Sequence, residues 1–253
     1  MNCKVLLAAL LSAFAVVGVS SCSNDDDDSK NDGGVFSGRK LQSYDDYKFV
    51  WDGNKVSKII STSEVEGGSV RERAMTISYK GKKATINWSE ESAPAVANLN
   101  DKGFITSWES LDSWGSDYAR GSAFSYDEKG HLVSYNVDST SGKINYNSDG
   151  DITSASIDGE RVSFSYTDSN VSKPIENKGN LMLMSEWGIM WDWEYFYWFG
   201  IYGKATAHLP VKVGNTKFHW NLDKQGYPTS CEVEEWDPYE GESSTSTISF
   251  KWN

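Results

Sequence analysis

Carboxylates are concentrated in residues 232–242, where glutamate and aspartate surround a single tryptophan. Two carboxylates that face each other could serve as the acid and the base of a glycosidase. The alternation from Glu232 to Glu234 instead predicts a strand with one solvated face, and Asp237-Pro238 predicts a turn. Two interpretations therefore stay open: the acidic loop of a glycan-directed hydrolase, or a solvated strand and turn.

A second group of oxygen-bearing side chains runs from Asn145 to Ile152 and resembles the first part of a calcium-binding loop. Such a loop requires an acid at its first position and a bidentate glutamate at its twelfth. Those positions hold Asn145 and Ser156, and the residues after Tyr146 fit a hairpin turn. We therefore expect no metal ion and no cofactor.

Cys22 is the residue whose chemistry is clearest. Lys4 and the uncharged apolar stretch from Val5 to Val19 are typical of a signal peptide, and a membrane span would need roughly 20 apolar residues. The sequence Val19-Ser20-Ser21-Cys22 then resembles the lipobox of bacterial lipoproteins. This resemblance implies that residues 1–21 are a lipoprotein signal peptide and that the Cys22 thiol carries lipid, which anchors the chain to a membrane.

Residues 22–34 contain a run of aspartates and no aliphatic or aromatic side chain, which predicts a disordered acidic tether. An acidic run directly after the lipidated cysteine resembles the surface-export signal of Bacteroidetes lipoproteins. The resemblance implies a protein lipid-anchored in the cell outer membrane and facing the cell exterior. The alternative is that it faces the periplasm.

The formal net charge of −12 argues against nucleic acid or anionic lipid as a partner. Loss of Cys3 with the signal peptide and lipidation of Cys22 would leave Cys231 without a disulfide partner. A cysteine nucleophile needs a base beside it, and the chain has 3 histidines. We expect a buried, inert Cys231, find no catalytic constellation, and predict that the chain is not an enzyme.

The middle of the chain repeats one pattern, in which alternating aromatic and polar residues lead into a polar turn that contains glycine. Tyr126, Tyr146 and Tyr166 recur at every twentieth residue. Each unit predicts a β-hairpin, and hairpins that are marginal alone must stack edge to edge. We therefore predict one mainly β domain over residues 35–253, an antiparallel β-meander of repeated hairpins that forms a long twisted sheet.

The unit from Tyr126-Asp127 through Gly130 to Leu132 resembles the tyrosine-aspartate repeat of Rhs-type cell-surface proteins. Those proteins build large shells from many copies. This chain has about seven units, and we expect that number to be too small to close such a shell.

Residues 181–203 interrupt the repeats with a dense run of aromatic side chains. Acidic residues in this run would each cost about 2.5–3.5 kcal/mol near a bilayer centre, which excludes a membrane span. Asp192 as a cap, Glu194 in the first turn and Gly203 after the end predict a short aromatic helix over 192–202. A shorter helix before it would end at Gly188.

The block from Phe199 to Pro210 resembles a block of an uncharacterised Bacteroidetes lipoprotein family that is known only as a domain of unknown function. Together with the repeats and the lipobox, this resemblance covers most of the mature chain. It implies a fold and a location, but no activity and no catalytic residues.

Four tryptophans are candidates for stacking on sugar rings: Trp187, Trp191, Trp193 and Trp236. In the competing interpretation, the aromatic residues of 181–203 form the core, because a helix that covers one face of a sheet needs bulky side chains. Asp138-Ser139-Thr140 is similar to the acceptor of Bacteroidetes protein O-glycosylation, which implies modification of Ser139.

Taken together, these patterns predict a surface-exposed lipoprotein that acts as a non-catalytic binding or structural module of the cell envelope. Its expected partners are the membrane, through the lipid on Cys22, and an outer-membrane protein or a glycan. The alternative is a glycan-directed hydrolase that uses the acidic loop 232–242.

Overall fold

The computed structural model describes residues 38–65, 69–91, 93–110, 121–190, 194–237 and 241–253. The predicted signal peptide, the tether and Cys22 lie outside the described residues, as do Trp191 and Trp193. Within the described ranges, no helix has the length and the apolar composition needed to cross a membrane.

One antiparallel sheet of 16 strands makes up most of the molecule. Nearly all neighbouring strands are consecutive in sequence, which confirms the predicted meander of hairpins. The exceptions are the pairings of β1 with β18 and of β12 with β15, while β13 and β14 form a separate pair. The strands are β1 (Leu41–Tyr44), β2 (Tyr47–Asp52), β3 (Lys55–Val65), β4 (Ser69–Lys80), β5 (Lys83–Trp88), β6 (Ala95–Leu99), β7 (Ile105–Ser110), β8 (Ala123–Tyr126), β9 (Leu132–Val137), β10 (Thr140–Tyr146), β11 (Ile152–Ile157), β12 (Glu160–Ser165), β13 (Ile175–Glu176), β14 (His208–Leu209), β15 (Lys212–Val213), β16 (Thr216–Leu222), β17 (Pro228–Asp237) and β18 (Glu242–Trp252).

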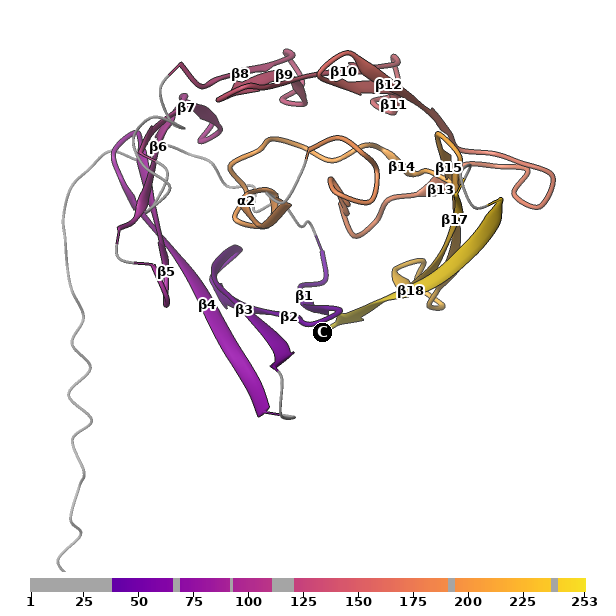
Figure 1. Ribbon diagram of the computed structural model, residues 1–253, viewed down its shortest axis with the longest axis horizontal. Coiled ribbons are helices and arrows are strands. Elements are labelled where there is room, and N and C mark those ends of the chain that lie inside the picture. Colours follow the sequence, from indigo (N-terminus) through magenta and orange to yellow (C-terminus); the bar gives the residue numbers. More distant parts are fainter. Residues whose placement is uncertain (1–37, 66–68, 92, 111–120, 191–193, 238–240) are drawn as a thin grey trace, which may run out of the picture.

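The sheet curls until its two end strands, β7 and β8, come close to each other, so that it forms a nearly closed ring (Figure 1). The expectation that the hairpins are too few to close a shell did not foresee this curvature. The ring closes around an internal segment, described over residues 181–190 and 194–203, which we call the plug (Figure 1).

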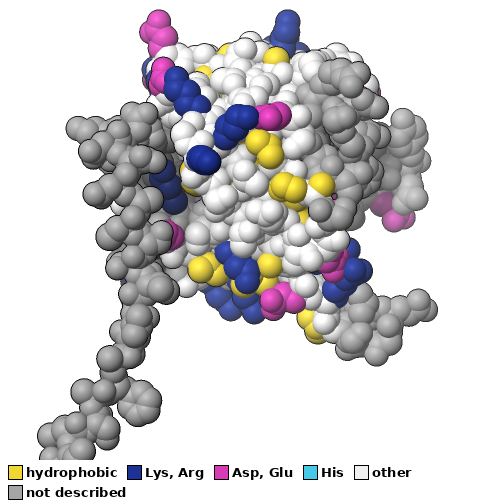
Figure 2. Space-filling view, turned by 90° about the vertical axis from the view of Figure 1, so that its left-hand side faces the viewer, with side chains coloured by type: hydrophobic (Ala, Val, Ile, Leu, Met, Phe, Trp, Pro, Cys, Tyr) yellow, Lys and Arg dark blue, Asp and Glu magenta, His cyan; other side chains and the backbone are white. Residues whose placement is uncertain are grey.

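Alternation along the strands separates an apolar inner face from a polar outer face. In β10, Ile144 is buried while Lys143 and Asn145 are exposed. In β18, Ile248 and Phe250 are buried while the residues beside them are exposed. Figure 2 shows the outer face on the β4–β6 side, where charged side chains lie among separate small apolar spots. The outer face of the ring therefore meets water.

The plug supplies the centre of the hydrophobic core. Trp198 packs against Tyr44 and Phe49, with ring centroids 5.6 and 5.3 Å apart. Phe196 lies 4.7 Å from Trp108, centroid to centroid. The plug residues that are almost completely buried are Leu181, Met182, Leu183, Met184, Trp187, Ile189, Met190, Phe196, Tyr197, Trp198, Phe199, Ile201 and Tyr202.

The short aromatic helix α2 spans Glu194–Trp198, so it ends before the predicted end at 202, and the predicted cap Asp192 lies outside the described residues. Gly200, with φ of 83°, ends it, and the N–H of Ile201 donates to the carbonyl of Phe196 at 3.2 Å. The glycine that was expected to end the helix, Gly203, lies beyond it. Residues 184–188 form one turn rather than a helix, and this turn ends at Gly188, where φ is 58°.

Candidate binding groove at the seam of the sheet

Four turns of the repeats share one hydrogen-bond pattern. An Asn or Asp opens each turn, and its side-chain oxygen accepts the N–H of the residue four positions later. A glycine with positive φ precedes that residue. The four bonds join Asn100 to Phe104 (3.0 Å), Asp127 to His131 (2.8 Å), Asn147 to Asp151 (2.9 Å) and Asp223 to Tyr227 (3.0 Å).

The seam is the place where β7 and β8 meet, and the plug helps to close it. The carbonyl of Ile201 accepts the N–H of Ile105, at the start of β7, at 2.8 Å. The same carbonyl accepts the hydroxyl of Tyr126, at the end of β8, at 3.3 Å. Further along the seam, the N–H of Trp108 donates to the hydroxyl of Ser122 at 2.7 Å.

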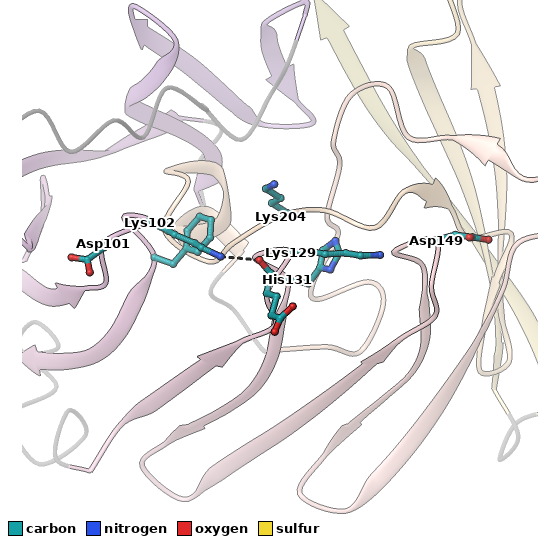
Figure 3. A pocket seen from close by; sticks show the side chains of 8 residues that line it. Asp101, Lys102, Lys129, His131, Asp149 and Lys204 are labelled. Carbon is teal, nitrogen blue, oxygen red and sulfur yellow. Dashed lines mark hydrogen bonds between the residues drawn. The ribbon is translucent and has the colours of Figure 1, made fainter.

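A groove of about 590 Å³ lies at the turn end of this seam (Figure 3). Lys102 and Lys129 occupy the position before the glycine in two neighbouring turns, and Lys204 comes from the chain that leaves the plug. Figure 3 places Asp101 and Asp149 at the two ends of the row, with the three lysines between them. The groove is lined by Asp101, Lys102, Phe104, Glu128, Lys129, His131, Asp149 and Lys204.

Backbone carbonyls hold two of the lysines in place. The ammonium of Lys102 donates to the carbonyl of Glu128 across the seam at 2.9 Å. The ammonium of Lys129 donates to the carbonyl of Ser148 in the next turn at 2.5 Å. Each ammonium has three donors, so Lys129 can donate to a ligand as well as to this carbonyl. The Asp101 carboxylate forms an ion pair with Lys82, which holds the pKa of this carboxyl below its usual value.

His131 forms part of the groove wall and is held on several sides. Its Nδ1 lies 2.8 Å from Oδ2 of Asp127, and its ring stacks on Tyr146 with centroids 4.5 Å apart. Burial raises the pKa of Asp127, but hydrogen bonds from the side chain and backbone of His131 outweigh this effect and lower the pKa overall. A Cβ on Gly150 would lie 3.3 Å from the imidazole, so the next turn also limits its position.

In a second histidine–aspartate pair, Nδ1 of His208 is 2.9 Å from Oδ2 of the buried Asp151. Thr206 and the backbone N–H of His208 also bond to this carboxylate. Among the described residues, no serine, threonine or cysteine bonds to either imidazole. Neither pair is therefore arranged to activate a nucleophile.

The tryptophans singled out in the sequence do not form one surface. Trp187 is completely buried in the plug, so its proposed role in stacking on a ligand is wrong and the core interpretation holds. Trp236 is 48% exposed, on β17. Trp191 and Trp193 lie outside the described residues.

The acidic segment 232–242 forms the end of β17 and the start of β18, and residues 238–240 lie outside the described part. Glu234 pairs with Lys217 at 2.8 Å, which lowers the pKa of this carboxyl. A general acid in a glycosidase needs a raised pKa instead. Alternation places Glu235 on the opposite face of the strand from Glu232 and Glu234.

Cys231 is completely buried, as expected, and burial raises the pKa of its thiol, which makes it a poor nucleophile. Ser139 is exposed in the turn between β9 and β10. Among the residues that the structure describes, no group of three or more histidine, cysteine, aspartate or glutamate side chains could hold a metal ion.

Sequence reasoning missed the groove, although it identified the turns that build it. The available signal was the dipeptide Lys-Gly at the same position of two turns, Lys102-Gly103 and Lys129-Gly130. The third lysine, Lys204, lies in the block after the plug, and only the fold brings it to the turns.

Comparison with known proteins identifies the fold but no family. No family model and no curated protein matches the chain. A solved porin-like protein from Bacteroides uniformis ATCC 8492 shares 18% identity, with 82% of this chain and 90% of that chain covered and a TM-score of 0.66. A porin-like protein from Bacteroides vulgatus ATCC 8482 shares 14% identity, with 85% and 99% covered and a TM-score of 0.47. The first of these shows that the curled sheet occurs in another protein.

Proposed function

We propose that this chain is a non-catalytic binding module of the bacterial cell envelope, anchored to the outer membrane by lipid on Cys22 and facing the cell exterior. The observation that carries the proposal is the filled ring. Since the plug fills the space inside the ring, the surfaces that remain for binding are the two rims and the polar outer face.

The filled interior also separates the proposal from a passage for solutes. Side chains such as Trp187 and Tyr197 are completely buried at the centre of the ring. Interiors packed in this way hold few voids larger than a water molecule. The packed interior therefore supports a binding module rather than a passage for solutes.

The seam groove is the proposed binding surface on one rim. Three lysines approach it, and carbonyls of the neighbouring turns hold two of them. Donors that are fixed before binding lose less conformational entropy when a ligand arrives. Anionic groups of a glycan or of an outer-membrane protein fit this set of donors.

A hydrolase that uses segment 232–242 is the less favoured alternative. Among its described carboxylates, Glu234 has a lowered pKa, because of Lys217, rather than the raised pKa of a general acid. Cys231 in the same strand is buried. No observation on this segment favours catalysis over a solvated strand.

Lipidation is tested by labelling cells with a radioactive fatty acid and isolating the protein. We expect label on the wild type and on Cys231→Ala, which removes the other cysteine of the mature chain, and none on Cys22→Ala. Label on Cys22→Ala would overturn the anchor. Proteinase treatment of intact cells tests orientation, since degradation of the wild type supports an outward-facing domain and full protection contradicts it.

Binding at the groove is tested with an array of acidic and neutral glycans and with purified outer-membrane proteins. Lys204→Glu should abolish any binding through the groove. Lys251→Glu is the matched control, because Lys251 is exposed on β18 and does not line the groove. Equal loss in both variants would point to nonspecific charge attraction and contradict the proposal.

A further inference from the structure

The hairpin of β17 and β18 extends beyond the neighbouring strand on one side. β18 pairs with β17 in continuous register from Glu242 to Ser249. On its other edge, β18 pairs with β1 only through the three residues from Phe250 to Trp252. The side chains from Glu242 to Thr247 are all exposed. We call this projecting part of the hairpin the arm.

The arm and the groove lie at opposite rims. The turn that opens at Asp223 lies at the start of β17 and is built like the turns of the groove. The arm extends from the other end of β17, because antiparallel neighbours reverse direction at every turn. A partner bound at the arm would therefore not compete directly with a ligand in the groove.

Hydrogen bonds at Ser249 reveal which backbone groups of β18 face outward. The N–H of Ser249 donates to the side chain of Asp45 at 2.6 Å, and its carbonyl accepts the N–H of Asp45 at 2.9 Å. The backbone groups of Ser249 therefore point toward β1. Since this direction recurs at every second residue, those of Thr247, Thr245 and Ser243 point the same way. These three residues lie beyond Phe250, which is the last residue of β18 that pairs with β1.

Among the described residues, no strand pairs with the outer edge of β18 from Ser243 to Thr247, which we call the free edge, and this edge lacks the usual protection. Exposed edges generally carry a charged residue, a proline or a bulge, which prevents pairing with another chain. This segment reads Ser-Ser-Thr-Ser-Thr, with no charge, no proline and no shift in its register with β17. It is a strand of hydroxyl residues with backbone donors and acceptors on its outer edge.

We propose that the free edge of β18 binds an extended, basic segment of a partner protein, which adds one strand to the sheet. This inference depends on one part of the proposed function, namely that the chain is a binding module. The main-chain groups of Ser243, Thr245 and Thr247 would supply the hydrogen bonds, as in other cases of strand addition.

Charge around the edge selects a basic partner. Glu232, Glu235 and Glu242 are exposed on the arm, within one strand of the edge. Lysines or arginines on an added strand would face these carboxylates, whereas like charges on neighbouring strands are unfavourable. A second copy of this chain would bring the same acidic arm, so the arrangement disfavours pairing of two copies.

Trp236 offers an anchor for the same partner. It pairs in register with Ser243, and it is 48% exposed. Cross-strand partners share one face of the hairpin, so an added strand beside β18 would lie one strand away from the indole. Exposed tryptophans of this kind contribute strongly to protein interfaces.

The test uses the purified mature chain and a synthetic nine-residue peptide of alternating threonine and lysine. Amide hydrogen exchange is measured by NMR with and without the peptide. We expect exchange at Ser243, Thr245 and Thr247 to slow by at least about fivefold, because these amides become hydrogen-bonded. Ser244 and Ser246, whose amides face β17, should change little.

Two controls separate strand addition from charge attraction. The same peptide with N-methyl groups at alternate residues keeps its charge but cannot pair, and it should give no protection. Thr245→Pro removes one outward N–H and should abolish the protection of Thr247, whereas Thr245→Val keeps the backbone donor and should retain it. Circular dichroism of both variants checks that the sheet is intact.

Three outcomes would overturn the proposal. They are equal binding of the N-methylated peptide, unchanged binding to a folded Thr245→Pro variant, and protection that rises with protein concentration alone, which would indicate a second copy instead. Because the assay involves neither membrane nor lipid, failure of the anchor at Cys22 would leave its result unchanged, and the two proposals fail independently.

Discussion

The hydroxyl of Tyr135 donates to the backbone carbonyl of Ile189 at 2.6 Å, which joins β9 to the plug. Other tyrosines of the sheet make the same kind of contact, such as Tyr79 to Phe199 at 3.0 Å. The ring of Tyr135 also lies over Gly142 of β10, where an added Cβ would come within 2.0 Å of it. The plug is thus held by hydrogen bonds from the strands as well as by packing.

Removing one of these hydroxyls should destabilise the protein only where it has a partner. Tyr135→Phe leaves the buried carbonyl of Ile189 without a hydrogen-bond donor among the described residues, and we expect a loss of about 1–3 kcal/mol in the free energy of unfolding. The hydroxyl of Tyr146 is buried and has no partner among the described residues, so Tyr146→Phe should be neutral or slightly stabilising. Urea denaturation measures both, and equal losses would contradict the distinction.

Glu186 of the plug should reduce stability at neutral pH. Burial raises the pKa of its carboxyl, and the nearby charges of Glu235 and Asp45 raise it further. A carboxyl whose pKa is raised by folding binds its proton more tightly in the folded state, so it opposes folding above that pKa. We expect Glu186→Gln to have a higher melting temperature than the wild type at pH 7.

The pH dependence provides the control for Glu186. The difference between the two proteins should shrink as the pH falls through the raised pKa and vanish below the ordinary glutamate value of 4.5. Glu160→Gln, on an exposed residue of β12, should show no comparable gain. A gain for Glu186→Gln that stays constant down to pH 3 would contradict the electrostatic explanation.

Asp127 should behave in the opposite way. Its folded-state pKa is lowered overall, because hydrogen bonds from His131 outweigh the effect of burial, so its contribution to stability is present above the usual aspartate value and fades at lower pH. Asp127→Ala should cost about 1–2 kcal/mol, through loss of the acceptor for the His131 N–H.

Asp127→Asn is the informative comparison, because asparagine opens the sister turns at Asn100 and Asn147. It should keep the turn and lose only the charged contact with His131. Its melting temperature should therefore lie between those of the wild type and Asp127→Ala. A loss as large as that of alanine would show that the charge, rather than the turn, dominates.

O-glycosylation at Ser139 stays a prediction, and the exposed position of this residue in the turn between β9 and β10 leaves its hydroxyl accessible. Mass spectrometry of protein from the native host should find a glycan on the peptide that contains Ser139, and Ser139→Ala should remove it. Ser141→Ala, two residues further along β10, is the control. An unmodified wild-type peptide would contradict the prediction.

The hairpins were predictable because their signals are local. The twenty-residue spacing of Tyr126, Tyr146 and Tyr166, with turns between them, specifies strands and turns without reference to the rest of the chain. The curvature of the sheet was not predictable in this way. It depends on contacts between distant residues, such as the carbonyl of Ile201 that accepts bonds from both β7 and β8.

For the aromatic segment too, the local sequence predicts the secondary structure but not the tertiary contacts. Its composition predicted a short helix against the sheet, which the structure contains as α2. Whether Trp187 faced a ligand or the core depended on the sheet wrapping around it, and periodicity within the segment carries no such information. The three lysines of the groove, from two turns and the exit of the plug, also meet only in the fold.

The pairing of β1 with β18 makes the order of assembly unusual. Strands that follow one another in the chain can pair as soon as they are made, but Leu41 finds its partner, Trp252, only when the final strand is available. Until then, β1 keeps an open edge that could pair with another chain. A newly made chain would therefore stay open to aggregation along β1 until β18 is in place, so the hairpin of β17 and β18 joins the two runs of consecutive strands.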